Sequence, residues 1–226
     1  MVDSLPLFPL GTVLLPGANL PLHVFEPRYR QLVVDLTTEA VDADSFGVIA
    51  IRKGWSADIH DLRELHRVGC TAVLREVRRL PDGRFDIVTT GDRRFRLLSI
   101  DHTTAPYLVG TVQWLPDTEV PTELSPALPM LANAARSAHR RYCSVAWRKQ
   151  DWSEPPADTD PSVLANLLAA DGLLAMRDRQ RLLEEIRPER RLRLIRRMLT
   201  EEAGILRQLR AIPVSLPEFG QQASQN

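Results

Sequence analysis

The hydrophobic pattern of the chain opens with a stretch, residues 5–29, that is rich in leucine and proline and poor in charge. Within it, residues 20–24 alternate between leucine or valine and other side chains, which predicts a half-buried β-strand. Pro16 and Gly17 precede this strand and are typical of a turn, because proline presets φ and glycine accepts a positive φ. Pro21 lies inside the strand. Since proline removes a ladder donor, we expect this strand at an edge of a sheet.

A helix is predicted directly after this strand. Glu26 is followed by Pro27, and proline is favoured at the first position of a helix, where its missing N–H costs nothing. Four apolar residues then follow at helical spacing, which are Tyr29, Leu32, Val33 and Leu36. The opening stretch therefore predicts a strand–turn–strand–helix unit of the core. A second hypothesis is that its apolar surface also receives a partner chain.

Strand-like patterns separated by turn signals dominate the chain as far as Leu115. They cover residues 46–52, 69–78, 84–90, 94–100 and 107–115. The sequence Leu-Pro-Asp-Gly at residues 80–83 predicts a hairpin turn, and Gly91 is expected to break or bulge its strand. Short strands at this spacing are typical of a closed or half-closed β-barrel.

The hydrophobic period changes after the polar connection at residues 116–121. Apolar residues recur at four-three spacing over residues 124–145, which predicts an amphipathic helix. The Asp-Pro pair at residues 160–161 supplies an N-cap and a first helical residue, and so predicts the start of a second helix. A third helix is predicted over residues 176–186, and Pro188 begins the last and longest one.

We therefore predict an α+β protein in which a β-barrel is followed by a bundle of helices. The predicted domains are a barrel at residues 1–117, a helical bundle at residues 122–212 and a flexible tail at residues 213–226. With 226 residues, such a chain can bury a substantial core without disulfides or metals.

Composition and charge argue against several classes of protein. The formal net charge is zero, so no global attraction draws the chain to nucleic acid or to a membrane. No segment has the length of a membrane-spanning helix, and the N-terminus lacks the pattern of a signal peptide. Cys70 and Cys143 form neither a zinc pattern nor a CxxC motif, so we expect reduced, buried thiols and a cytoplasmic protein. Lys53 and Lys149 are the only lysines, and neither precedes Ser or Thr, so the sequence holds no Walker A phosphate loop.

Three segments carry a resemblance to a known family. They are LPLFPLGTVLLPG at residues 5–17, LPLHVFEPRY at residues 20–29 and GDRRFRLLSI at residues 91–100. The helical half keeps the same helix–proline–helix register, and the chain resembles the stand-alone bacterial form of the Lon N-terminal domain over about residues 5–210. The resemblance implies a PUA-like β-pseudobarrel followed by a helical bundle.

The same resemblance implies a function. In full-length Lon proteases this region helps to select unfolded or tagged substrates and supports the hexamer, and the ATPase and Ser-Lys peptidase modules that follow it there are missing here. It therefore implies a non-enzymatic module that binds unfolded or tagged polypeptides, as an adaptor to proteolysis with a protease as its partner. We expect no cofactor and no metal. The resemblance supplies no established binding residues.

Five residues are predicted to form the polypeptide-binding surface, which are Leu14, Leu15, Leu20, Phe25 and Trp55. The first four are apolar residues of the opening stretch. An exposed indole in a polar loop suggests a contact site, and both Trp55 and Trp152 lie in such loops. Trp114, at the end of a predicted strand, is instead expected in the core. His23, inside a predicted strand, is expected to be a structural histidine.

Two polar clusters have a structural and a functional interpretation. The first comprises Asp58, His60, Asp61, Glu64 and His66, whose spacing is not that of a helical metalloprotease and favours a solvated loop. The second is the segment 177–210, where 11 arginines stand against six acids, which favours a solvated helix face. The alternative is a PUA-like RNA-binding protein that uses these arginines. Because the segment has no aromatic residue for base stacking, nucleic acid is not the expected partner.

Overall fold

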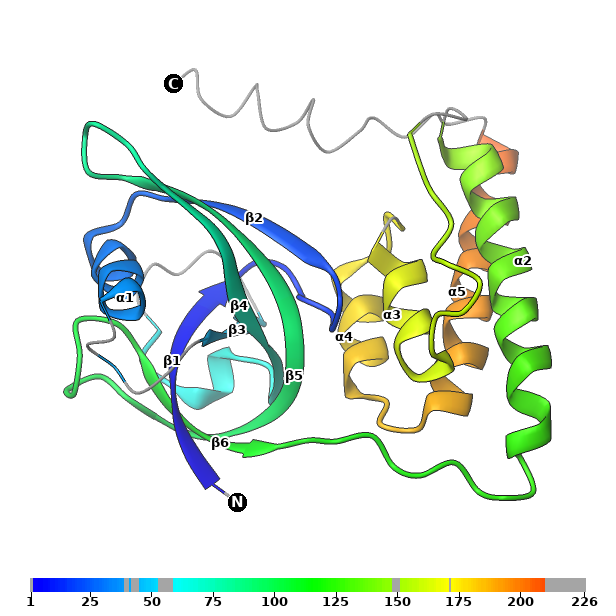
Figure 1. Ribbon diagram of the computed structural model, residues 1–226, viewed down its shortest axis with the longest axis horizontal. Helices are drawn as coiled ribbons and strands as arrows, with labels where there is room; N and C mark the ends of the chain where they lie inside the picture. Colours follow the sequence, from blue (N-terminus) through cyan, green and yellow to red (C-terminus); the bar gives the residue numbers. More distant parts are fainter. Residues whose placement is uncertain are drawn as a thin grey trace.

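The computed structural model describes residues 2–38, 41, 45–52, 59–147, 151–170 and 172–209. A β-barrel and a group of helices lie side by side, joined by the segment that follows residue 114 (Figure 1). This arrangement confirms the α+β class predicted from the sequence. None of the helices within the described residues is both long and apolar enough to cross a membrane. The predicted tail, residues 213–226, lies outside the described residues.

The described strands form one mixed sheet that closes on itself. They are β1 (Val2–Leu10), β2 (Asn19–Val24), β3 (Ser45–Ala50), β4 (Val68–Arg79), β5 (Phe85–Asp101) and β6 (Val109–Trp114). Their order is β2-β5-β4-β3-β1-β6, and β6 also pairs with β5, so the strands from β5 round to β6 close into a barrel. β1 and β3 are parallel, whereas the other pairs are antiparallel. The predicted closed or half-closed barrel is therefore confirmed.

β5 takes part in this barrel twice. Residues 85–90 pair with β2, residues 95–101 pair with β6, and β4 follows β5 over most of its length. Beyond Gly91 the strand bulges. Gly91 and Arg94, three residues apart on β5, lie opposite Ala72 and Cys70, which are only two residues apart on β4. Thr71 of β4 binds the backbone of the bulge. Its hydroxyl accepts a hydrogen bond from the Arg93 N–H at 2.9 Å and donates one to the Arg93 carbonyl at 3.2 Å. The predicted irregularity at Gly91 is thus a bulge inside one continuous strand.

β2 is an edge strand. All of its residues pair with β5, and no other described strand pairs with it. Pro21 fits this position, because an edge strand needs ladder N–H groups on one side only. The turn before β2 contains Gly17 with a φ of 80°, the positive value that the Pro-Gly pair predicts.

The first helix, α1 (Pro27–Thr37), begins and packs as the sequence predicts. Pro27 is its first residue and Glu26 its N-cap. Its buried residues are Tyr29, Leu32, Val33 and Leu36. The Tyr29 ring stacks on Phe8 of β1 at a centroid distance of 4.0 Å. This contact holds α1 to the barrel on the side away from the other helices (Figure 1).

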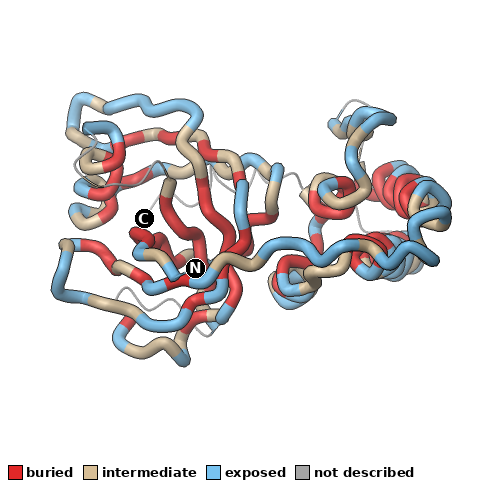
Figure 2. Tube along the Cα trace, turned by 60° about the horizontal axis from the view of Figure 1, so that its bottom comes forward, coloured by how far each residue is buried: buried red, intermediate tan, exposed pale blue. Residues whose placement is uncertain are grey.

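The remaining helices are α2 (Leu128–Ala146), α3 (Pro161–Ala170), α4 (Met176–Glu184) and α5 (Pro188–Leu209). α3 and α4 lie nearest to the barrel, and α2 lies farthest from it (Figure 1). α5 buries Leu192, Ile195 and Leu199, which lie on one face of the helix. One cluster of buried apolar side chains includes Leu15, in the barrel half, and Leu164, in the helices. Buried residues occur in both parts of the Cα trace (Figure 2). The division into domains at residues 117 and 122 stays a prediction.

Candidate binding site

The structure separates the residues of the predicted binding surface. Leu14 and Leu15 are only 4% and 1% exposed and belong to the core. Leu20 is partly buried on β2, whereas Phe25, directly after β2, is 60% exposed. Trp55 lies outside the described residues. Of the predicted residues that the structure describes, only Phe25 is therefore exposed, Leu20 packs partly against the core, and the two buried leucines belong to the core itself.

The burial of Leu14 and Leu15 follows from the close approach of their segment to β5. A Cβ on Gly91 would lie 2.2 Å from the Leu15 carbonyl oxygen, so only glycine lets the two backbones meet here. The Gly17 N–H donates to the Gly91 carbonyl at 2.8 Å, and the Gly91 N–H donates to the Ala18 carbonyl at 2.9 Å. These bonds fix the segment over the bulge, with its leucines in the core.

Leu20 and Leu22 of β2 are partly buried against the core, on the same face as the buried Val24, and Phe25 directly after the strand is exposed. We define the β2 edge as Leu20, Leu22 and Phe25 together with the backbone groups of β2 that β5 does not engage. An edge strand presents N–H and C=O groups with which an extended chain can pair, and the side chains along it select the guest. Pro21 removes one donor but keeps its carbonyl, which lowers the tendency of the edge to pair with a second copy of itself.

His23 supports this edge. Its ring lies beside that of Phe25, with the two centroids 6.4 Å apart. Its Nδ1 lies 2.7 Å from the Asp86 carboxylate, and its Nε2 lies 3.1 Å from a terminal nitrogen of Arg84. Hydrogen bonds from His23 and Arg78 hold the pKa of Asp86 below its ordinary value. His23 is thus hydrogen-bonded on both nitrogens, as expected of a structural histidine.

A hollow that the sequence did not predict lies where the barrel meets the helices. Its volume is about 360 Å³, and its lining combines apolar residues, which provide most of the exposed surface, with polar and charged ones. We call it the junction groove, and its apolar lining residues are Pro16, Trp114, Leu115, Pro116 and Val163. The Arg93 guanidinium lies over the Trp114 ring, 3.9 Å from its centroid, and the indole N–H donates to Asp3. Trp114 is therefore half-buried in the wall of a groove, and not fully enclosed in the core as we expected.

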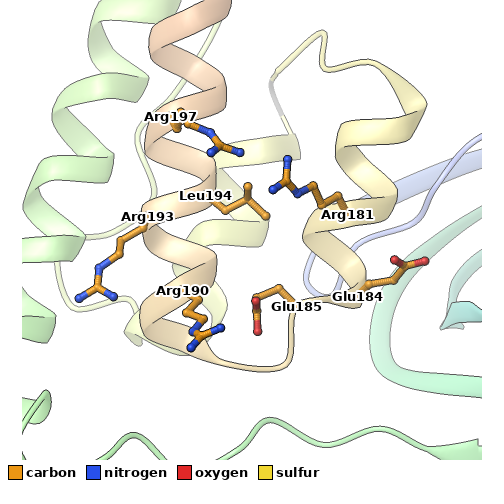
Figure 3. A pocket seen from close by; sticks show the side chains of 7 residues that line it. All are labelled: Arg181, Glu184, Glu185, Arg190, Arg193, Leu194 and Arg197. Carbon is orange, nitrogen blue, oxygen red and sulfur yellow. The ribbon is translucent and has the colours of Figure 1, made fainter.

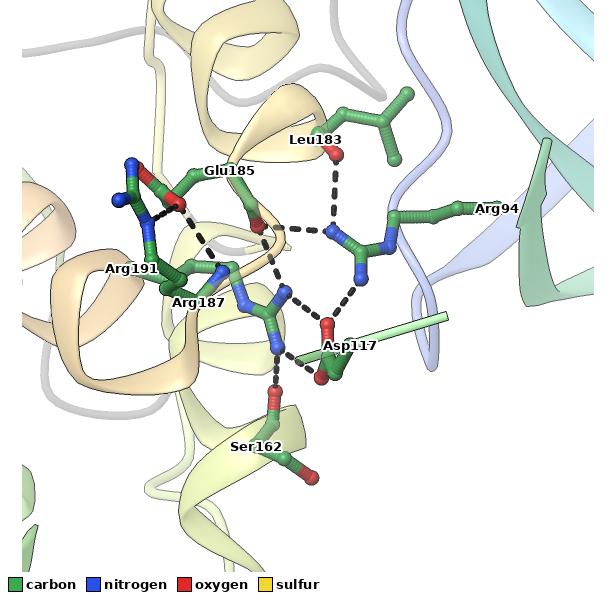
Figure 4. Close-up of polar contacts among 7 residues, drawn as sticks. All are labelled: Arg94, Asp117, Ser162, Leu183, Glu185, Arg187 and Arg191. Atoms are coloured by element: carbon green, nitrogen blue, oxygen red, sulfur yellow. Dashed lines mark hydrogen bonds and ion pairs between the residues drawn. The ribbon is translucent and has the colours of Figure 1, made fainter. Parts of the chain in front are cut away.

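Two buried arginines line the junction groove, and Figure 4 shows the polar contacts that they make. Arg94 of β5 and Arg191 of α5 are 6% and 1% exposed, and both bind the carboxylate of Asp117. Arg191 donates to Asp117 from both terminal nitrogens, at 2.8 and 2.7 Å. Arg94 also donates to the carbonyls of Leu183 and Glu185, at 3.2 and 2.8 Å. Burial lowers the pKa of Arg94, while Asp117 opposes this shift. The network ties the barrel to the turn between α4 and α5, and so fixes the walls of the groove.

One local signal in the sequence points to this network. Arg191 lies four residues before Ile195, on the buried stripe of α5, and a charged residue within an apolar stripe requires a buried partner. The partner itself has no local signal. Asp117 is 74 positions from Arg191 and 23 from Arg94, and hydrophobic periodicity does not pair residues at such separations.

The acidic and histidine-rich cluster has a structural role. Asp61 and Glu64 form a capping box around a short 3-10 helix (Leu62–Glu64). Hydrogen bonds from Arg63 lower the pKa of Asp61 to about 2. Among the described residues, no group of three His, Cys, Asp or Glu side chains is placed to hold a metal. The favoured interpretation as a loop thus agrees with the part of the cluster that the structure describes; Asp58 lies outside it.

The cysteines and Trp152 are also explained by packing. Cys70 and Cys143 are free thiols and fully buried, as expected. Burial raises the pKa of Cys70 to about 12, so its thiol stays protonated and is a poor nucleophile. Trp152 is half-buried and meets the ring of His139 edge-on, at 5.6 Å. It does not present the exposed indole that would mark a contact site.

The arginine-rich segment is not one solvated face. Arg191 is buried in the network described above, and Arg179 donates to three backbone carbonyls at the end of α3 and just beyond it. The exposed arginines of the segment include Arg181, Arg193 and Arg197. They lie on α4 and α5.

The fold is shared with solved N-terminal domains of Lon proteins. The Lon N-terminal domain protein from Xanthomonas campestris aligns with a TM-score of 0.59 and 27% identity, over 93% of this chain and 99% of that one. The N-terminal domain of the Mycobacterium avium complex Lon protease aligns with a TM-score of 0.64 and 19% identity, over 88% and 99% of the two chains, and shows the same fold. Residues 4–201 match the model of the ATP-dependent protease La (LON) substrate-binding domain. The chain therefore belongs to the Lon substrate-binding domain family.

Curated relatives agree with this assignment. Lon protease 1 of Thermus thermophilus is 28% identical over 204 residues, and the Lon protease of Roseiflexus castenholzii is 31% identical over 207 residues. The alignments cover 88% and 90% of this chain, but the chain spans only 25% of the length of either relative. The resemblance found in the three sequence segments is confirmed.

Proposed function

We propose that this chain is a non-enzymatic module that binds unfolded, apolar-rich polypeptides and delivers them to a separate protease. The observation that carries this proposal is the β2 edge, where a strand paired on one side only is followed directly by the exposed ring of Phe25. Membership of a substrate-binding family supports a binding role. The two free, buried thiols favour action in a reducing compartment such as the cytoplasm.

An extended guest fits this surface by strand addition. Backbone hydrogen bonds to β2 supply affinity for any sequence, and contacts with Leu20 and Phe25 supply the preference for apolar side chains. Such a guest has few charged contacts, so its affinity depends little on ionic strength.

The junction groove extends the same surface. Pro16 lines the groove, and β2 begins at Asn19, three residues further along the chain. Three extended residues span at most about 11 Å, so one guest strand can reach both the groove and the β2 edge. An apolar side chain of the guest would then rest between Trp114 and Val163.

The test is a binding assay with a permanently unfolded, fluorescently labelled apolar-rich polypeptide. Phe25→Asp places a charge where the guest packs, and we expect a loss of affinity of about tenfold or more. Met130→Asp is the matched control, because Met130 is 66% exposed at the start of α2, remote in sequence from β2. Unchanged affinity in Phe25→Asp, or equal losses in both variants, would contradict the proposal.

RNA binding stays an untested alternative. The hollow between the arginine-bearing helices α4 and α5 is lined by charged residues and one leucine, without an aromatic ring on which a base could stack. The polypeptide proposal therefore stands ahead of it.

A further inference from the structure

A second groove lies between α4 and α5, and the polypeptide proposal makes no use of it. Its volume is about 700 Å³. Four of its lining residues are arginines: Arg181 on α4, and Arg190, Arg193 and Arg197 on α5 (Figure 3). Leu194 lies among them, with its side chain directed towards α4 (Figure 3). We call this site the α4–α5 groove.

The arginines of this groove outnumber the acids that line it with them, Glu184 and Glu185. Arg181, Arg190 and Arg193 are exposed, and none of their side chains forms a hydrogen bond or an ion pair within the described part of the chain, although the charge of Arg190 helps to lower the pKa of Glu185. Arg197 has one exposed contact, 3.7 Å from Glu201. Since the whole chain has no net charge, this excess is a local feature and not a consequence of a basic composition.

Two of the arginines face each other across the groove, whereas the Arg193 side chain extends away from α4 (Figure 3). Arg190, Arg193 and Arg197 recur at three-to-four-residue spacing along α5, and their first and last Cα atoms are about 10 Å apart along the helix axis. Arg181 of α4 and Arg197 of α5 extend into the space between the two helices (Figure 3). Two like charges on facing helices repel each other, and an anionic group between them removes this repulsion.

The other lining residues narrow the choice of anion. Glu184 and Glu185 lie at one end of the groove, where they would repel a uniformly charged polyanion. Glu185 is already paired with Arg187 at 3.0 Å, whereas Glu184 is exposed. Leu194 adds an apolar contact at the centre, and the lining holds no aromatic ring for a nucleobase. These features fit a chain that alternates carboxylates with apolar side chains.

We propose that the α4–α5 groove binds an acidic, leucine-containing peptide segment of another protein. Its carboxylates accept hydrogen bonds from Arg181 and Arg197, and its apolar side chain packs on Leu194. This site is separate from the β2 edge. Its affinity falls as salt rises, because exposed charges carry it.

The probe is a labelled synthetic peptide of alternating glutamate and leucine, compared with a peptide in which lysine replaces glutamate. Arg181→Glu/Arg197→Glu reverses two charges inside the groove. The matched control is Arg177→Glu/Arg196→Glu, which makes the same change in charge on the same helices at exposed residues outside the groove. We expect the acidic peptide to bind the unmodified protein, to bind the groove variant at least about tenfold more weakly, and to bind the control variant almost as well.

Three results would overturn this inference. They are absence of binding by the acidic peptide, equal binding by the lysine peptide, and equal losses in the two double variants. A fourth is tighter binding by a short single-stranded oligonucleotide that displaces the peptide and depends on Arg181 and Arg197, which would assign the groove to nucleic acid. Thermal unfolding of both double variants checks that each is folded. Peptide binding at the α4–α5 groove does not depend on polypeptide binding at Phe25, so the two proposals can fail separately.

Discussion

Asp117 and Arg191 form a two-point ion pair, at 2.8 and 2.7 Å, between the segment that leaves the barrel and the last helix. The same carboxylate binds Arg94 of β5. Its position between two buried guanidinium groups makes Asp117 the one acid that balances them in this network. The pairing therefore controls how the helices are held on the barrel, and with it the shape of the junction groove.

Removing this carboxylate should destabilise the protein strongly. Asp117→Ala leaves Arg94 and Arg191 buried without their counter-charge, and we expect a loss of about 2–4 kcal/mol, reduced from the value for a fully buried pair because Asp117 is partly exposed. Urea unfolding measures it. Glu201→Ala removes only an exposed contact with Arg197 and should change stability little. Equal stability of the two variants would show that the network is dispensable.

Gly91 provides a second test of the fold beneath the β2 edge. In Gly91→Ala, the new Cβ meets the Leu15 carbonyl at 2.2 Å, and backbone on both sides prevents an easy adjustment. We expect a loss of about 2–3 kcal/mol or more. Gly204→Ala, inside α5, has open space around its Cβ and should be stabilised by about 0.5–1 kcal/mol. Chemical unfolding measures the change in the free energy of unfolding for the two variants. The changes should have opposite signs if the close approach at Gly91 is real, and they should be similar if it is not.

The local patterns of the sequence predicted the elements well, because each depends on near neighbours. Pro27 and the four apolar residues after it define α1, and the Pro16-Gly17 turn and the edge position of Pro21 follow from the chemistry of proline and glycine. These features need no knowledge of the rest of the fold.

The candidate site depended on distant contacts and was harder to predict. Leu14 and Leu15 are apolar residues in a loop, and nothing local distinguishes a core position from a surface one; the contact with Gly91 decides it. The junction groove likewise depends on residues far apart in the sequence, such as Pro16 and Val163, which both line it. The binding role of Leu20 and Phe25 stays a prediction, as does that of Trp55.

The buried thiol of Cys70 predicts how stability changes in alkali. Its pKa rises from 9.0 to about 12 in the folded protein, because burial disfavours the thiolate. Below pH 9 the thiol is protonated in both states, but between pH 9 and 12 only the unfolded state loses the proton. The free energy of unfolding therefore falls as pH rises through this window. The slope of the free energy of unfolding against pH is proportional to the number of protons released on unfolding. In Cys70→Ala this number should be smaller by up to about one, so the free energy should fall less steeply. Identical pH profiles of the two proteins would contradict the shift; both keep Tyr107, whose raised pKa of about 12 affects them equally.

The helices should be needed for a stable barrel. A fragment that ends at Asp117 loses the partner Arg191 and exposes the barrel surface on which α3 and α4 lie. We expect poor solubility or a lower midpoint of thermal unfolding than that of the full chain. A fragment that is soluble and equally stable would show that the barrel is an independent domain.

The last prediction separates the β2 edge from the arginines of α5. Strand pairing and apolar contacts release few counterions, so binding of an unfolded, apolar-rich polypeptide should change little between low and physiological salt. Phosphate contacts behave differently, because each neutralised phosphate of a single strand adds about 0.7 to the slope of log affinity against log salt.

The arginines of α5 provide the matched variant. Arg193 and Arg197 line the α4–α5 groove and take no part in the β2 edge. Arg193→Glu/Arg197→Glu should therefore leave polypeptide binding nearly intact. If RNA instead binds more tightly than any polypeptide, with a steep salt slope that this double variant abolishes, the RNA-binding alternative is correct and the apolar residues of β2 serve only the fold.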